Sequence, residues 1–410
     1  MSDDNNSYQP PSQILDKYAD VLVNFALNHG QGLTKGEVVL LRVPDVAKDL
    51  ARALQVKVLQ AGGHPIVRLS PTGNFEKDFF EYASEDQLSF FPSAYFKAQA
   101  DTIDHQVSII ADVDPYELQL IDPRKVLLTS ESIKPYRDWL TIKELQNKFS
   151  WTAALWATES KAKTVGLSLK DYWQQIIQAC FLDEEEPVKH WQELNRQQKV
   201  LKTKISELDI DWVHVQGDDI DLKIQIGEQR RWQSGSGANI PSFEVFTSPD
   251  WRGTKGWVRF NQPMYRYGNV VEDIYLKFKE GVVTDYSASS NQAFLDKMLG
   301  TPNSDKVGEF SLTDQRMSRI THLMAEILYD ENITNNTHIA LGSAYRDCYA
   351  GDHSGFKEED WDRLGFNDSA LHSDLISTTD RQVTAKLGNG KEKIIYENGQ
   401  FTIWDPQDVL

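Results

Sequence analysis

Strand-like and helix-like patterns of apolar residues alternate along the first half of the chain. The apolar run at 37–43 predicts a buried strand, and after Pro44 the apolar positions recur with a helical period until Gly62. Further strands are predicted at 65–69, 107–113, 125–130 and 150–157. Helices are predicted at 136–149 and at 168–182, where Ser168 is a suitable N-cap. Repeated β-α units of this kind predict an α/β domain with an open, largely parallel sheet.

The pattern changes after the acidic run "DEEEP" at 183–187. A helix is predicted at 188–208, and short alternating β patterns dominate from there on. They lie at 211–217, 219–227 and 271–288, the last being a hairpin that turns at "KEG". Two more helices are predicted near 291–299 and 315–328. We therefore expect an α/β domain at 1–185 and an α+β domain at 186–410.

Length and composition agree with this division and exclude several classes of function. A chain of 410 residues is too long for one hydrophobic core. The net charge of −18 argues against nucleic acid and anionic membranes as partners. The first half has no GxGxxG after its first strand and no phosphate-binding loop, so a structural or dimer-forming role is favoured for it. The polar start has no secretory signal pattern and predicts a short disordered segment on a cytoplasmic protein.

The second half contains five carboxylates and imidazoles in apolar or glycine-flanked settings. They are Glu244, Glu309, His338, His372 and Asp374. Taken singly, each is more simply explained as an ion-paired carboxylate or a core histidine. Taken together, they form an oxygen and nitrogen ligand set that suits two divalent ions such as zinc, cobalt, manganese or magnesium. Two such ions side by side are a common device for activating water and polarising a carbonyl group.

Four segments carry a resemblance to a known family. "IPSFEVFTSP", "VGEFSL", "HIALGSAY" and "LHSDL" occur here in the same order as in the thermophilic-type metallo-aminopeptidases, the family of aminopeptidase T and aminopeptidase S. The first domain is similar too, in "ILDKYADVLVNFALNHGQGLTKGEVVLL". The resemblance implies a cytoplasmic, homodimeric exopeptidase that removes N-terminal amino acids from peptides. Its catalytic domain would be 186–410, and two divalent metal ions would be its cofactors.

The same resemblance implies roles for individual residues. It makes the five residues above metal ligands, and it makes Tyr345, seven positions after His338, the catalytic tyrosine. Glu309 is the candidate to bridge the two ions, and either Glu244 or Glu309 would carry the proton from the attacking water to the leaving amine. Tyr345 would donate a hydrogen bond to the oxyanion; a packed aromatic ring is the simpler explanation without the resemblance. Phe243 replaces the glycine that commonly precedes the first glutamate, which affects the expected substrate preference more than the chemistry.

Two other functions use the same residues. A carboxypeptidase or an amidohydrolase could place the same two ions against a different end or bond of its substrate. A non-catalytic binding protein could use a metal only for stability. The complete ligand set and Tyr345 favour an enzyme.

Overall fold

The computed structural model describes residues 8–266 and 268–406. The chain forms two compact units. The first holds the residues up to Asn195 together with Gly235–Ser242 and His322–Asp330, and the second holds Arg196–Ser234, Phe243–Thr321 and the residues from Glu331 on. The domain boundary that the sequence predicts between 185 and 186 stays a prediction. Residues 1–7 of the start that is predicted to be disordered lie outside the described residues. No helix inside the described residues is long and apolar enough to cross a membrane.

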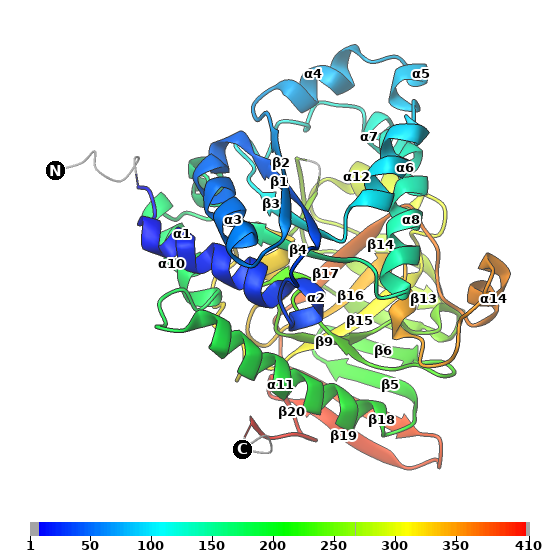
Figure 1. The fold of residues 1–410 in the computed structure, drawn as a ribbon. Helices are drawn as coiled ribbons and strands as arrows, with labels where there is room; N and C mark the ends of the chain where they lie inside the picture. The colour runs from blue at the N-terminus through cyan, green and yellow to red at the C-terminus, as the bar shows by residue number, and fades with distance from the viewer. Residues whose placement is uncertain (1–7, 267, 407–410) are drawn as a thin grey trace. The chain divides into compact units, whose positions relative to one another are not determined.

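The first unit is built on a five-stranded parallel sheet in the order β2-β1-β3-β4-β8. Its strands are β1 (Val38–Pro44), β2 (His64–Ser70), β3 (His105–Ile110), β4 (Ser150–Leu155) and β8 (Asn239–Ile240). Its α-helices are α1 (Ser12–Val21), α2 (Leu27–Gly30), α3 (Lys48–Gln60), α4 (Phe75–Tyr82), α5 (Glu85–Leu88), α6 (Ser93–Thr102), α7 (Pro123–Ser132), α8 (Lys134–Leu145), α9 (Glu159–Thr164), α10 (Leu169–Ala179) and α13 (Ile327–Asp330). Helix α3 covers one face of the sheet, and α6 and α8 cover the other (Figure 1).

The predicted open, largely parallel α/β sheet is confirmed, and one of its predicted elements is wrong. The Ser168 side chain accepts a hydrogen bond from the backbone N–H of Asp171, as its predicted N-cap role requires. The segment at 125–130 is not a strand but part of helix α7. Asp122 caps this helix by accepting from the backbone N–H of Arg124, and Pro123 occupies its first position. These two start signals outweigh the β-propensity of the apolar run.

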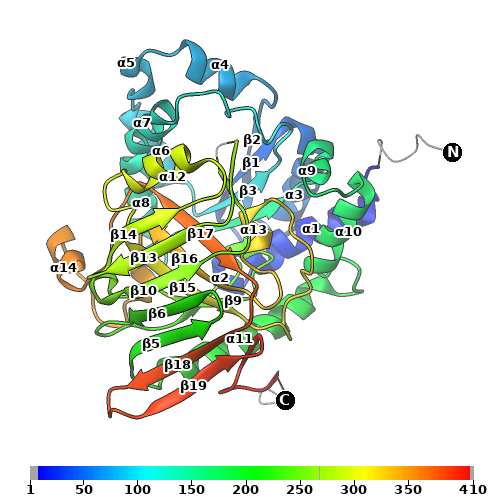
Figure 2. The same cartoon turned by 180° about the vertical axis from the view of Figure 1, so that it is seen from behind.

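The second unit contains two larger antiparallel sheets and a hairpin. The eight-stranded sheet, seen strand by strand in Figure 2, has the order β14-β13-β10-β6-β5-β18-β19-β20. Its strands are β5 (Ile210–Gly217), β6 (Ile220–Gln225), β10 (Lys255–Arg259), β13 (Tyr275–Lys279), β14 (Val282–Ser287), β18 (Arg381–Leu387), β19 (Glu392–Glu397) and β20 (Gln400–Phe401). The five-stranded sheet comprises β17 (His372–Ser377), β16 (Thr337–Gly342), β15 (Val307–Thr313), β9 (Glu244–Thr247) and β7 (Gln233–Ser234) in that order. The hairpin consists of β11 (Met264–Arg266) and β12 (Asn269–Val271).

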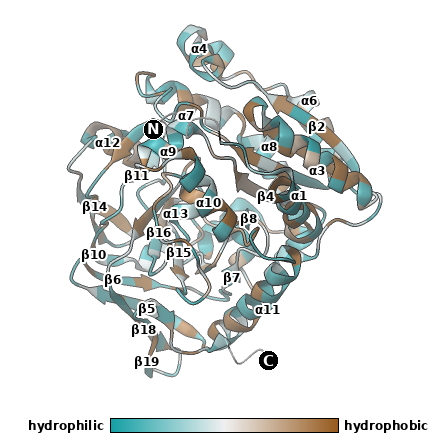
Figure 3. Ribbon diagram, turned by 90° about the vertical axis from the view of Figure 1, so that its left-hand side faces the viewer, coloured by the Kyte–Doolittle hydropathy of each residue, from teal (hydrophilic) through white to brown (hydrophobic). Residues whose placement is uncertain are grey.

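Few helices accompany these sheets. They are α12 (Gln292–Leu299) and α14 (Glu358–Arg363), while α11 (Pro187–Ser206) begins in the first unit and ends in the second. Hydrophobic and hydrophilic residues alternate along α11, as its amphipathic pattern predicts (Figure 3). Side chains of both large sheets, including Val215, Leu222, Phe310 and Ile339, line one common cavity. One face of the five-stranded sheet therefore packs against the eight-stranded sheet, which leaves the other face for a site.

The predicted α+β class of this unit is confirmed, but the helix predicted at 315–328 is wrong. In this part of the described chain only α13, from Ile327, is helical. Side-chain oxygens accept hydrogen bonds from backbone N–H groups that would donate to backbone carbonyls in a helix. Asp314 accepts from the N–H of Arg316, and Asp330 accepts from the N–H of Met324. Local bonds of this type compete directly with helix formation.

Candidate metal centre

Four neighbouring strands of the five-stranded sheet place the predicted ligands on one face. In antiparallel sheets, residues that stand directly opposite each other share a face. On β16 and β17, Ala340 stands opposite Asp374, and Gly342 stands opposite His372. Ala340 also stands opposite Glu309 on β15. His338 lies two residues before Ala340 on β16, so it shares that face, and the pairing of β9 with β15 puts Glu244 there as well. The face therefore presents Glu244, Glu309, His338, His372 and Asp374.

The five side chains form two groups that share Glu309. In the first group, Nε2 of His338 lies 3.5 Å from Oε2 of Glu244 and 3.8 Å from Oε1 of Glu309. In the second, Nε2 of His372 lies 3.2 Å from Oε2 of Glu309 and 3.2 Å from Oδ1 of Asp374. Within each group the potential ligand atoms all lie within 4.8 Å of one another. Glu309 thus directs one carboxylate oxygen to each group.

A bulge at Gly308 directly precedes Glu309. The pairing of β15 with β16 shifts register between Val307 and Glu309. A Cβ atom on Gly308 would lie 2.4 Å from the carbonyl oxygens of Gly342 and Ser343, so a larger residue does not fit. The bulge puts Val307 on the face opposite to Glu309, whose pairing with Ala340 continues the regular register of residues 310–312.

The two groups differ in their access to solvent. Glu309 and His338 are almost completely buried, whereas the side chain of His372 is 23% exposed and that of Asp374 is 11% exposed. Water and a substrate can therefore approach the second group more easily than the first.

The cluster brings three carboxylates together with only two imidazoles, so its negative charge is not fully offset by neighbouring cations. Burial, and after it the charge of Glu309, raises the pKa of Glu244 to about 7. Burial opposes ionisation of Asp374 as well, but His372 lowers the pKa of Asp374 to about 2. Glu309 and Asp374 in turn raise the pKa of His372 well above its usual value, against the effect of burial. The cluster holds protons to offset its carboxylates, and a divalent cation can replace those protons.

The hydrogen bonds at Nδ1 of His338 and His372 bear on whether Nε2 of each ring can bind a metal. Nδ1 of His372 lies 2.8 Å from the carbonyl oxygen of Ser343, so Nδ1 carries a proton and Nε2 faces the carboxylate oxygens. Without a metal, the raised pKa of His372 places a second proton on Nε2, between the ring and the carboxylates, and a divalent cation can take that place.

Nδ1 of His338 lies 2.9 Å from Nδ2 of Asn336, whose Oδ1 is buried without a partner. The same Nδ2 also donates to the carbonyl oxygen of Glu331, so the amide faces His338 as a donor and Nδ1 accepts. Nε2 of His338 faces Glu244 and Glu309, and a metal would take the place of its proton there. The residues fit a divalent cation.

Tyr345 lies beside the more exposed group. Its ring centroid is 5.0 Å from that of His372 and 5.4 Å from that of Phe246, and 38% of the residue is exposed. Its backbone N–H donates to Oγ of Ser248 at 2.8 Å. Desolvation, followed by the charges of Glu309 and Asp374, raises the pKa of Tyr345 well above its usual value. The phenol therefore keeps its proton at neutral pH and can act as a hydrogen-bond donor.

Four supporting groups around the ligands were not identified from the sequence. Asn336 contacts His338, and Oγ of Ser311 donates to Oε2 of Glu244 at 2.8 Å. Nη1 of Arg266 donates to the carbonyl oxygen of His372 at 2.7 Å, and the Ser343 carbonyl accepts from the same histidine. Asn336 and Ser311 stand two residues from a predicted ligand, a spacing that puts them on the same face of a strand and could have identified them. The other two contacts involve backbone carbonyls, which no sequence pattern reveals.

Comparisons with known proteins agree with this geometry. The sequence pattern of the family described as "Thermophilic metalloprotease (M29)" matches residues 12–401. Aminopeptidase T of Thermus aquaticus is 28% identical over 95% of this chain and 98% of its own length. Aminopeptidase AmpS of Bacillus subtilis is 26% identical over the same shares of the two chains. The solved structure of wild-type AmpT from Thermus thermophilus superposes with a TM-score of 0.75 at 22% identity and covers 95% of this chain and 99% of that one, which confirms the fold.

These findings confirm the resemblance that the sequence motifs indicated. A family of metalloproteases hydrolyses peptide bonds with the help of a divalent metal, so the predicted peptide-bond hydrolase is confirmed at that level. The match spans nearly the whole length of the chain. The protein therefore belongs to the thermophilic metalloprotease family M29.

Proposed function

We propose that the protein is an aminopeptidase that releases N-terminal amino acids from peptides and uses two divalent metal ions. The observation that carries the two-ion assignment is the position of Glu309, whose two carboxylate oxygens face separate ligand groups. The aminopeptidase assignment is supported by relatives that carry this name and match this chain over almost its full length.

Each ion would have its own ligands and would share Glu309. Glu244 and His338 would hold the first ion, and His372 and Asp374 would hold the second. The set contains only oxygen and nitrogen donors, which suits zinc, cobalt, manganese or magnesium. When bound, such ions supply Lewis acidity toward the scissile carbonyl group and favour the ionisation of water.

The chain's own residues would move the protons. A carboxylate has to accept the proton of the attacking water and deliver it to the leaving amine. Glu244 and Glu309 are the two candidates, and Ser311 holds Glu244 in place through its hydroxyl. Tyr345 would donate its phenolic hydrogen to the oxyanion that develops on the carbonyl oxygen. Its place beside His372, at the solvent-accessible group, supports this role.

A substrate panel distinguishes an aminopeptidase from a carboxypeptidase or an amidohydrolase with the same ligands. The panel compares aminoacyl-p-nitroanilides, free peptides and the same peptides with an acetylated N-terminus or an amidated C-terminus. We expect hydrolysis to require the free N-terminal amine and to be insensitive to C-terminal amidation. Cleavage of the acetylated peptides at a similar rate would contradict the proposal, and so would cleavage that requires a free C-terminus.

We also propose that the protein forms a homodimer. The resemblance implies this state, and the edge strand β2 exposes Ile66, Val67 and Leu69, a type of surface that often pairs with another chain. Size-exclusion chromatography with light scattering should give twice the mass of one chain, and the mass of a single chain would contradict the proposal. The cytoplasmic location expected from the sequence stays a prediction.

A further inference from the structure

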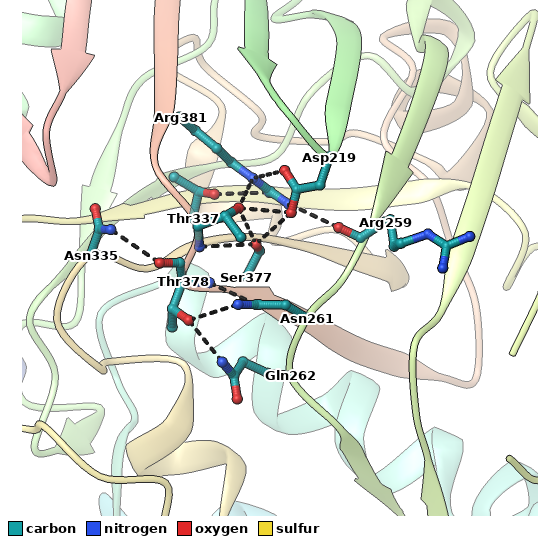
Figure 4. Close-up of polar contacts among 10 residues, drawn as sticks. Asp219, Arg259, Asn261, Gln262, Asn335, Thr337, Ser377, Thr378 and Arg381 are labelled. Atoms are coloured by element: carbon teal, nitrogen blue, oxygen red, sulfur yellow. Dashed lines mark hydrogen bonds and ion pairs between the residues drawn. The ribbon is translucent and has the colours of Figure 1, made fainter. Parts of the chain in front are cut away.

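A polar network lies at one end of the strand pair that carries three of the five candidate ligands. Thr337 is the first residue of β16, directly before His338, and it stands opposite Ser377, the last residue of β17. Because side chains alternate along a strand, Thr337 points to the face opposite to His338. Figure 4 shows the side chains that meet there, with Arg381 and Asp219 at the centre.

Arg381 links β16 to the eight-stranded sheet. Its guanidinium group is buried and pairs with Asp219, with Nη2 3.1 Å from Oδ2 and Nε 3.2 Å from Oδ1. Nη1 donates to Oγ1 of Thr337 at 2.9 Å, and Nη2 donates to the carbonyl oxygen of Arg259 at 3.1 Å. One planar cation thus connects the first residue of β16 with strands β10 and β18.

Asp219 holds the end of β17 in the same way. Besides Arg381, its Oδ2 accepts from Oγ of Ser377 at 3.3 Å and from Oγ1 of Thr379 at 2.7 Å. Asp219 itself lies in the turn between β5 and β6. The carboxylate therefore ties the end of β17, and the turn that follows it, to a fixed point of the larger sheet.

The turn after β17 has further contacts of its own. Asn261 accepts from the backbone N–H of Thr378 at 3.0 Å, and Gln262 donates to Oγ1 of Thr378 at 2.8 Å. Asn335 donates to the carbonyl oxygen of Thr378 at 3.1 Å, which joins the turn to the residues just before β16 (Figure 4). Both strands are anchored at this end.

The opposite end of the strand pair is fixed by close backbone packing. A Cβ atom on Gly342 would lie 2.1 Å from the carbonyl oxygen of Leu371, and Ser343 accepts from the ring of His372. His338 and Asp374 lie between these two fixed ends. A metal site requires its ligand atoms to be held within about 0.5 Å of their productive positions, so the relative position of β16 and β17 matters directly.

We propose that Asp219 and Arg381 are positioning residues that set the placement of His338, His372 and Asp374 through the ends of β16 and β17, and so determine metal affinity. This inference rests on the proposed ligand roles of those three residues. Neither Asp219 nor Arg381 touches the ligand face, so their loss should act on metal binding through strand position.

Three variants test the proposal by removing increasing parts of the polar network. Thr337→Val removes one hydroxyl and keeps the shape of the side chain, so the protein should fold. Arg381→Lys keeps the charge but loses the forked geometry, and Arg381→Met removes both. Arg316→Met is the matched control, because Arg316 pairs with Asp314 at 2.6 Å in the same unit and donates to the carbonyl oxygen of Phe401.

The measurements are the affinity of the chelator-stripped protein for Zn²⁺, by competition with a zinc-binding dye, the visible spectrum of the Co²⁺ form, and the melting temperature of the metal-free form. We expect weaker Zn²⁺ binding by about 3-fold or more in Thr337→Val and by about 10–100-fold in the Arg381 variants, the range seen when an outer partner of a ligand is lost. The Co²⁺ spectrum should change in the same variants. Arg316→Met should lower the melting temperature but leave Zn²⁺ affinity within twofold of wild type.

Two other results separate this inference from the proposed function. If wild type binds Zn²⁺ and both Thr337→Val and Arg381→Lys bind it equally well with an unchanged Co²⁺ spectrum, the positioning role is wrong and the ligand assignment stands. An equal loss of affinity in Arg316→Met would also overturn the positioning role, since general destabilisation would then explain the effect. If wild type itself binds no divalent metal, the proposed function fails, and the inference fails with it.

Discussion

Replacing Glu309 by glutamine should disturb both ligand groups at once. The substitution keeps the size of the side chain and removes its charge. Oε1 of Glu309 faces His338 and Oε2 faces His372, so one change alters a ligand in each group. By contrast, Glu244→Gln alters only the first group and Asp374→Asn only the second.

The magnitude follows from the geometry of the shared carboxylate. Loss of an outer partner of a metal ligand costs about 10–100-fold in affinity, and a directly bound anionic ligand should cost more. We expect the affinity for each ion to fall by at least about 10²-fold, or about 2.7 kcal/mol per ion. Because positioning of the substrate and activation of water fail together, kcat should fall by about 10³-fold or more.

Elemental analysis and kinetics on the same preparations provide the assay. After dialysis at a fixed free Zn²⁺ concentration, wild type should retain two ions per chain, Glu244→Gln and Asp374→Asn about one, and Glu309→Gln fewer than one. Asp250→Asn is the control, because Asp250 is a buried carboxylate of the same unit that pairs with Arg252 instead. Two bound ions and near-normal turnover in Glu309→Gln would refute the idea that Glu309 is a shared ligand.

Three further predictions concern the proposed role of Tyr345, the metal and the first unit. Tyr345→Phe should lower kcat by about 10²–10³-fold with little change in KM or metal content, whereas a purely packed ring predicts a lower melting temperature and normal turnover. Prolonged chelation should abolish activity and leave both units folded by circular dichroism, and Co²⁺, Zn²⁺ or Mn²⁺ should restore it; full activity in excess chelator would contradict a metal mechanism. Burial raises the pKa of Asp330 to about 7, so this group stabilises the folded state below pH ~4 relative to neutral pH, and the contribution is lost as the pH rises to about 7. Asp330→Asn removes this titration, but it also replaces one of the two oxygens that accept the backbone N–H groups of Met324 and Glu326, which costs stability at every pH. The stability of the variant relative to wild type should rise between pH 4 and 7, by at most about 4 kcal/mol, and parallel pH profiles in urea unfolding would contradict this.

The sequence predicted the type of secondary structure best where the apolar residues followed a single pattern, either that of a strand or that of a helix. The runs that became β1 and β4 are short, apolar and bounded by polar residues, so their type was evident. The run at 125–130 looks the same, but Asp122 and Pro123 at its start make it a helix. The segment after Asp314 has helical spacing without a helix, because carboxylates and hydroxyls bind its backbone N–H groups.

The sequence predicted which residues form the candidate site, but not how they lie relative to one another. The residue types and the order of the motifs brought the five side chains together as a hypothesis. Their common face depends on the register of four strands, which is set by pairing between distant segments of the chain. Contacts that join distant parts of the chain, such as Arg381 with Asp219 and Thr337, have no local pattern, so they appear only in the folded structure.

The most direct test of the account is to locate the ions in crystals grown with Zn²⁺. Anomalous difference maps from data collected on both sides of the zinc absorption edge identify zinc positions independently of any assumption about ligands. The account predicts two zinc peaks per chain, one bounded by Glu244, Glu309 and His338 and the other by Glu309, His372 and Asp374. A single peak, or peaks away from Glu309, in crystals of protein that hydrolyses aminoacyl substrates would contradict it.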